Sequence, residues 1–221
     1  MATAGVPVVK KSAIQAKHAM FVVYGLLMIL VFVSRDRLLL DPASWLRQRY
    51  APVSELMLLH GIPGAVALFL GIFQFSTRLR QRYLQVHRVM GRIYVASVAI
   101  AAPVAVAISL RLPIPTLTMA STIQASAWIL CTATGLYCAR TGRIPQHREW
   151  MIRGYPFAAV FVVVRAITAI PPVARAGLEG LAEVVWSVIA VACFLPSFLI
   201  EWQKLARTSR AVKVRAAAMG D

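Results

Sequence analysis

The stretch that decides the fold reads HRVMGRIYVASVAIAAPVAVAISL at residues 87–110. It begins with a His-Arg pair, carries a second arginine and a tyrosine shortly afterwards, and then runs to residue 110 without a charged side chain. A second stretch, residues 147–170, begins with the same pair and has the same order of arginine and tyrosine. About twenty apolar residues cross a hydrocarbon core ~30 Å thick. Each stretch therefore predicts a transmembrane helix with a polar head.

The composition extends this prediction to the whole chain. Of the 221 residues 59% are hydrophobic and only 14% are charged, and the apolar runs do not alternate as the strands of a membrane barrel do. We therefore expect an all-α, polytopic transmembrane bundle between two basic tails, 1–17 and 203–221. The six predicted spans lie at about residues 18–34, 56–75, 88–110, 116–137, 150–170 and 181–202.

The net charge of +16 is explained by topology rather than by nucleic acid. Most of the lysines and arginines fall in the two tails, in the loops 77–82 and 139–146, and beside the two His-Arg pairs. Short cytoplasmic loops of membrane proteins carry such an excess. We expect no nucleic-acid partner, both termini and both His-Arg pairs in the cytoplasm, and a multi-pass protein of the bacterial inner membrane.

Polar side chains gather at the cytoplasmic ends of two predicted spans. His87 and His147 enter the membrane at matched depth, and two such imidazoles suit the iron of one b-type haem. Arginines beside them suit its propionates, and the same group suits a quinone or an anionic head group. The alternative is that these side chains only anchor the helices at the interface. The remaining candidate residues at this level are Arg88, Arg92, Tyr94, Arg148 and Arg153.

A second polar level is expected near the outer ends of two spans. His60 and Arg165 each lie about five residues, roughly 8 Å, below the outer surface. Ionisable groups at such depth are costly and often functional. The pair predicts either an outer cavity for an anionic or carbonyl-bearing ligand, or a packing contact whose polar groups satisfy each other.

These motifs together resemble a family of bacterial predicted membrane proteins classed only as a domain of unknown function. The likeness covers about residues 60–202, and it implies topology but no reaction. A looser likeness is to the di-haem cytochrome b membrane superfamily, from which the chain departs because His60 has no histidine partner at its depth. The motifs of the family likeness are His60-Gly61, residues 71–75, His87-Arg88, Gly91-Arg92, Tyr94, His147-Arg148, Trp150-Met151, Arg153 and Arg165.

Three functions remain open from the sequence. The first is a redox membrane protein that holds one haem b, with His87 and His147 on the iron, or a quinone at the cytoplasmic side. The second is a small-molecule or lipid carrier that uses the outer His60–Arg165 cavity. The third is a scaffold or assembly subunit that binds another membrane protein and has no ligand.

Overall fold

The computed structural model describes residues 9–34, 36–44, 47–48, 50–112 and 114–219, and every regular element in these ranges is helical. The all-helical prediction is confirmed for this part of the chain. The chain divides into two compact units, Met1–Ser54 and Glu55–Asp221, and each is described by itself. The polar residues singled out above all lie in the second unit.

The first unit contains one long helix. It consists of α1 (Val9–Ser34), the short helix η1 (Asp36–Leu39) packed against it, and η2 (Ala51–Val53). The connecting loop is closed by local hydrogen bonds, in which the Asp41 carboxylate accepts the N–H of Ala43 at 2.9 Å and the Ser44 hydroxyl donates to the carbonyl of Leu38. Short polar side chains stabilise such turns.

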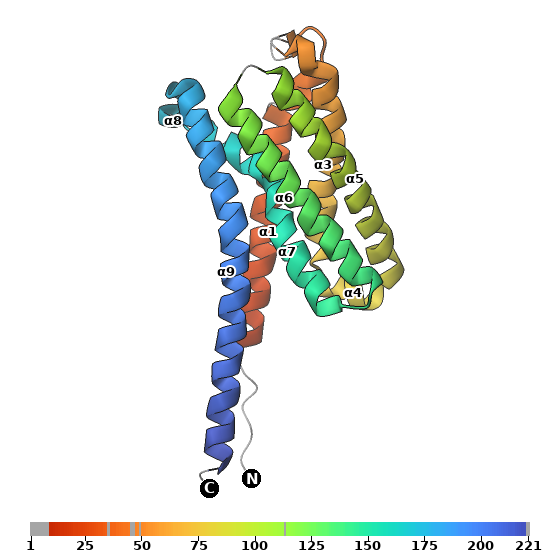
Figure 1. Cartoon of the computed structure of the whole chain (residues 1–221), viewed down its shortest axis with the longest axis vertical. Helices are drawn as coiled ribbons and strands as arrows, with labels where there is room; N and C mark the ends of the chain where they lie inside the picture. Colours follow the sequence, from red (N-terminus) through yellow and green to blue (C-terminus); the bar gives the residue numbers. More distant parts are fainter. Residues whose placement is uncertain (1–8, 35, 45–46, 49, 113, 220–221) are drawn as a thin grey trace. The chain divides into compact units, whose positions relative to one another are not determined.

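The second unit is a bundle of antiparallel helices joined by short turns (Figure 1). Helix α6 lies between α5 and α7, and α9 packs along α7. Figure 1 also shows that α9 continues past the other helices of this unit. The elements are α3 (Ser54–Gln74), α4 (Thr77–Arg82), α5 (Leu84–Arg111), α6 (Pro115–Arg140), α7 (Ile144–Thr168), α8 (Pro171–Arg175) and α9 (Gly177–Met219).

At one end of the bundle α3 and α6 end and α5 and α7 begin, and we call this the α4 end. Turn residues determine its local structure. The Ser76 hydroxyl accepts the N–H of Leu79 and caps α4. Gly142 adopts a positive φ of 74° in the turn after α6, which glycine tolerates without strain. Pro145 then occupies the first turn of α7, where its missing N–H costs nothing.

Helix α3 is attached to the bundle by a few specific side-chain contacts. The Tyr155 hydroxyl donates to the carbonyl of Leu68 at 3.0 Å, and the rings of Tyr94 and Tyr155 pack against Gly71. Without a hydrophobic driving force in lipid, helices associate through such close approaches and interhelical hydrogen bonds. Gly71 therefore positions α3 beside α5 and α7.

Within the described ranges, four helices are long and apolar enough to cross a membrane: Ala51–Gln74, Leu84–Arg111, Ile144–Thr168 and Gly177–Ala206. Only 17–33% of the residues in their apolar windows are buried, so their apolar faces are available to lipid. Helix α6 falls below this hydropathy because it carries several Thr and Ser residues and Gln124, whose amide donates to the carbonyl of Phe157 at 2.9 Å. The apolar part of α1, Phe21–Val33, is shorter than the four spans.

Each of the six predicted segments falls largely within a helix, and several of the helices extend beyond the predicted bounds. Helices α5 and α7 begin before the expected residues 88 and 150, so both histidines lie inside helices. Helix α9 continues through most of the expected tail to Met219. Residues 203–219 contain no Gly or Pro and are rich in helix-forming Ala, Lys and Arg, which explains the extension.

Candidate functional site

His147 is held in one orientation by its neighbour helix. It lies in the early part of α7, half-buried, and its Nδ1 lies 2.8 Å from the carbonyl oxygen of Gly135 on α6. Because a carbonyl can only accept, Nδ1 carries the proton and Nε2 is left with a free lone pair. His147 can therefore accept a hydrogen bond or ligate a metal through Nε2.

His87 lies at the same end of the bundle, in the first turns of α5. Arg80, Arg88 and His147 are close enough to its imidazole to interact with it electrostatically. Its Nδ1 is buried and has no hydrogen-bond partner among the described residues. The structure thus brings the two histidines to one polar region, and it leaves one imidazole nitrogen without a protein partner.

Gln74 belongs to the same region, although the sequence did not single it out as a site residue. It is the last residue of α3, and its Oε1 lies 3.6 Å from the position that a Cβ on Gly91 would take. Gly91 follows His87 by one helical turn, so both lie on one face of α5. The Gln74 Nε2 is buried and likewise has no partner in the described part of the chain. Two polar nitrogens without partners therefore line this side of α5.

Three arginines from three helices lie at this end of the bundle: Arg80 of α4, which is half-buried, and Arg88 of α5 and Arg148 of α7, which are exposed. We call them the three-arginine cluster. Arg80 was not predicted as a site residue. Burial lowers the pKa of its guanidinium below the usual value, and the positive charge of nearby Arg148 lowers it further. Arg92, which was predicted for this site, is exposed one turn further along α5. The α4 end therefore concentrates positive charge.

The structure places Tyr94 in the core of the bundle, about two helical turns beyond His87. It is 1% exposed, and its hydroxyl oxygen accepts a hydrogen bond from the indole N–H of Trp128 at 3.1 Å. Tyr155 packs edge-on against Phe75 with ring centroids 5.2 Å apart. Both tyrosines therefore contribute to the packing of α3, α5, α6 and α7 and lie next to the polar region.

Arg153 is drawn toward α9 and not toward the histidines. Its guanidinium lies 3.4 Å from Glu149 and 3.7 Å from Glu201, and it stacks over the Trp150 ring at 5.3 Å. Lys204 bridges the same two carboxylates at 3.0 Å each. Because two carboxylates already compensate its charge, we assign Arg153 to the α7–α9 contact rather than to the predicted ligand site.

The two residues of the predicted outer pair, His60 and Arg165, contact the same aromatic ring. His60 donates from Nδ1 to the carbonyl of Ala101 on α5 at 2.8 Å, and its ring meets Phe161 of α7 edge-on, with centroids 6.2 Å apart. The Arg165 guanidinium lies over the same Phe161 ring, 3.9 Å from its centroid. The two predicted residues thus both contact the Phe161 side chain, and Phe161 is the residue that the sequence reasoning missed.

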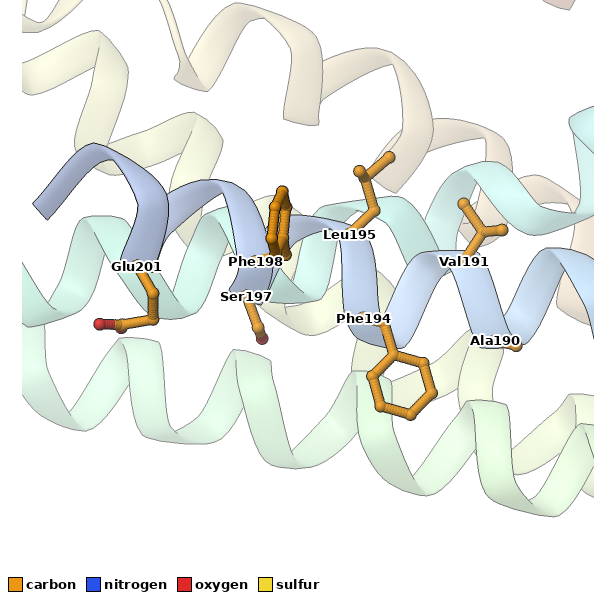
Figure 2. A pocket seen from close by; sticks show the side chains of 7 residues that line it. All are labelled: Ala190, Val191, Phe194, Leu195, Ser197, Phe198 and Glu201. Atoms are coloured by element: carbon orange, nitrogen blue, oxygen red, sulfur yellow. The ribbon is translucent and has the colours of Figure 1, made fainter. Parts of the chain in front are cut away.

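An apolar groove of about 700 Å³ lies elsewhere, on α9. Figure 2 shows the side chains that line it, all from this helix, with Phe194 and Phe198 the largest and Glu201 at one end. Phe194 is 76% exposed, as expected for a side chain that faces lipid. The groove carries almost no polar surface and lies apart from the histidines, so we do not treat it as the candidate site.

A comparison with protein-family models gives one result. The model described as "Predicted membrane protein (DUF2306)" matches residues 57–203, well over half of the chain. The chain belongs to the DUF2306 family. The matched region starts at the beginning of α3 and includes every candidate residue of both polar levels. The resemblance inferred from the sequence motifs is thereby confirmed as to family, and this member of DUF2306 is a membrane protein with transmembrane helices that contact the lipid bilayer.

The DUF2306 description names no reaction, ligand or partner. The chain matches no curated protein and no solved structure. We therefore infer the function from the geometry of the α4 end. Sequence reasoning singled out its histidines and two of its arginines. Gln74 appeared only within the 71–75 motif of the family likeness, and Arg80 only among the basic residues of loop 77–82.

Proposed function

We propose that this protein is a quinone-binding redox protein of the bacterial inner membrane, with six spans and both termini in the cytoplasm. The observation that carries the proposal is the pair of buried nitrogens without partners, His87 Nδ1 and Gln74 Nε2, on one side of α5. The distribution of basic residues supports the orientation. Helix α6, with 26 residues, is about 39 Å long and can span the membrane.

Burying a polar group without a partner costs ~1–3 kcal/mol. The Gln74 amide nitrogen donates, and His87 Nδ1 donates in the tautomer that carries its proton there, so a ligand with two acceptor oxygens relieves this cost at both nitrogens. A quinone has two carbonyl oxygens on a flat apolar ring, and its isoprenoid tail is compatible with the surrounding lipid. The ring would lie next to Gly91, where α5 carries no side chain and the Gln74 side chain is the nearest neighbour.

Binding of decylubiquinone to the purified protein in nanodiscs tests the proposal, with quenching of tryptophan fluorescence as the signal. We expect saturable quenching for the natural protein. The variants Gln74→Leu and His87→Leu should each weaken binding by about tenfold, because each removes a hydrogen bond of about 1 kcal/mol or more.

Two matched variants control for loss of an amide or an imidazole elsewhere. Gln146→Leu changes an exposed residue of α7, and His18→Leu changes a residue of the first unit. Both should bind decylubiquinone as the natural protein does. If quenching does not saturate, or if Gln146→Leu weakens it as much as Gln74→Leu, the protein has no quinone site at this place.

A second candidate, one haem b, is favoured by the geometry of His147. Its Nδ1 donates to a backbone carbonyl and its Nε2 is free, as in most metal-ligating histidines. His87 and His147 would hold the iron, and the three-arginine cluster would pair with the propionates. The haem itself would supply one-electron redox chemistry. The Gln74 side chain lies beside Gly91 and would have to move to admit a haem there.

The visible spectrum of the protein, purified from cells supplied with a haem precursor, distinguishes the two candidates. The haem version predicts a Soret band that is lost in His87→Ala and in His147→Ala and is kept in His18→Ala. If the spectrum shows no Soret band, or if the band survives both substitutions, the bis-histidine haem is excluded. The quinone proposal depends on Gln74 and His87 and is judged by the binding measurement alone.

A further inference from the structure

Four charged side chains join the start of α7 to α9, and we call them the α7–α9 latch: Glu149, Arg153, Glu201 and Lys204. The ammonium of Lys204 lies 3.0 Å from a carboxylate oxygen of Glu149 and 3.0 Å from one of Glu201. The guanidinium of Arg153 lies 3.4 Å and 3.7 Å from the same two carboxylates. Each of the four charges therefore has a partner of opposite sign on the other helix.

The latch residues lie on one face of each helix. On α9, Ser197, Glu201 and Lys204 follow one another at i, i+4 and i+7, and Figure 2 shows Ser197 and Glu201 on the same side of the helix. On α7, Glu149 and Arg153 have the spacing i, i+4. The Ser197 hydroxyl joins the two faces, because it accepts a hydrogen bond from Arg153 Nε at 3.4 Å. The latch therefore fixes the rotation of α9 as well as its position against α7.

Apolar packing of α9 ends where the latch begins. Ile200 is 8% exposed and is the last buried residue among the described side chains of α9. Trp202 and Leu205 are 61% and 65% exposed, and Figure 1 shows α9 continuing past the other helices of this unit. In the part that the structure describes, α9 beyond Ile200 is therefore held to α7 by ion pairs rather than by buried apolar side chains.

A weak point of the helix lies just before the latch. Pro196 is inside α9 and has no N–H, so the carbonyl of Ala192 loses its helical hydrogen bond, and sharp bends of helices concentrate at such positions. We call residues 197–219 the α9 arm, which is about 35 Å long at 1.5 Å per residue. A bend of about 20° at Pro196 therefore moves the end of the arm by about 12 Å.

We propose that the α9 arm is a movable element, which the latch holds against α7 and which bends at Pro196 when the latch opens. The side chains of the latch are 21–58% exposed, so salt or a competing charged group of a partner can weaken its ion pairs. Glu149 follows His147 by two residues, so the arm is attached to the part of α7 that carries the polar site. The arm itself is basic, with Lys204, Arg207, Arg210, Lys213 and Arg215 and no acidic residue.

Double electron–electron resonance on the full chain in phosphatidylcholine nanodiscs tests the proposal. One pair of spin labels joins Arg140→Cys, at the end of α6, to Ser209→Cys on the arm. The control pair joins Arg140→Cys to the native Cys193, which lies on α9 before Pro196. The other native cysteines of each protein are replaced by alanine.

The double variant Arg153→Gln/Lys204→Gln should widen the distance distribution of the arm pair by about 7 Å, since Ser209 lies about 20 Å beyond Pro196. About 1 M sodium chloride, at which the Debye length is ~3 Å, should widen it in the protein with an intact latch. The control pair should keep its distribution in both cases. Adding Pro196→Ala to the double variant should narrow the arm distribution again, because it restores the backbone hydrogen bond.

The double variant Arg78→Gln/Arg143→Gln is the matched control, because it removes two positive charges from exposed positions outside the latch. It should leave the arm distribution unchanged. The proposal is overturned if the latch variant leaves that distribution unchanged, or if the matched control widens it as much. It is also overturned if the Cys193 pair widens equally, or if Pro196→Ala has no effect, because the arm then does not bend at Pro196.

Discussion

The ring of Tyr155 occupies the space that a side chain on Gly71 would need. A Cβ built on Gly71 would lie 2.2 Å from Cε2 of Tyr155 and 3.3 Å from Cε2 of Tyr94. Each tyrosine belongs to one of the two His-Arg stretches. The two stretches that carry the polar site therefore also hold α3 in place, and the site depends on this contact for its geometry.

Replacing Gly71 by alanine should destabilise the bundle. The added methyl group forces Tyr155 and Tyr94 to move, and overpacking of this kind costs ~1–3 kcal/mol. We expect a lower Tm in mild detergent and weaker decylubiquinone binding, because Gln74 follows on the same helix. Gly64→Ala is the control, since no atom lies within 4 Å of its added Cβ. Equal Tm values for the two variants would contradict the proposed packing.

Removing the guanidinium of Arg153 should leave the quinone site intact. Arg153 pairs with carboxylates of α7 and α9 and lies outside the polar region described here. We therefore expect Arg153→Gln to bind decylubiquinone with unchanged affinity, with a Tm lowered slightly at low salt and not at high salt, since solvent-accessible ion pairs are screened. A tenfold loss of affinity for decylubiquinone would show that Arg153 belongs to the ligand site.

The outer contact between Arg165 and Phe161 can be measured by a double-mutant cycle. A cation over an aromatic ring contributes about 0.5–2 kcal/mol, depending on its burial. Unfolding free energies of Arg165→Gln, Phe161→Leu and the double variant should therefore give a coupling in this range. The absence of coupling would show that the two side chains do not interact, and it would remove the link between His60 and Arg165.

The helices of this protein follow from its sequence because apolar runs of membrane length leave few alternatives. The shared end of His87 and His147 also follows, since both lead a span from a basic turn. The roles of Tyr94 and Arg153 do not follow, because sequence spacing gives the face of a helix but not its rotation against neighbours. Gln74 and Arg80 reach the site only through the turn between α3 and α5, which local pattern does not specify.

The hydropathy of α6 shows a related limit. Its hydroxyl-bearing residues lower the hydropathy below that of the four clear spans, although Thr118 and Thr122 satisfy their hydroxyls by donating to backbone carbonyls. A helix placed between two others needs less apolar surface than one that faces lipid. Its proposed role as a span therefore rests on its length and on its position between α5 and α7, and only the position comes from the folded chain.

Photolabelling with an azido-quinone, followed by mapping of the labelled peptides, tests the central claim most directly. The account predicts labelling at the end of α3 and the start of α5, around Gln74 and His87, with competition by excess decylubiquinone and loss of label in Gln74→Leu. Competable labelling around His60 and Phe161 instead would place the quinone at the outer level and contradict the account. Label that excess decylubiquinone does not displace would mean that no specific quinone site exists.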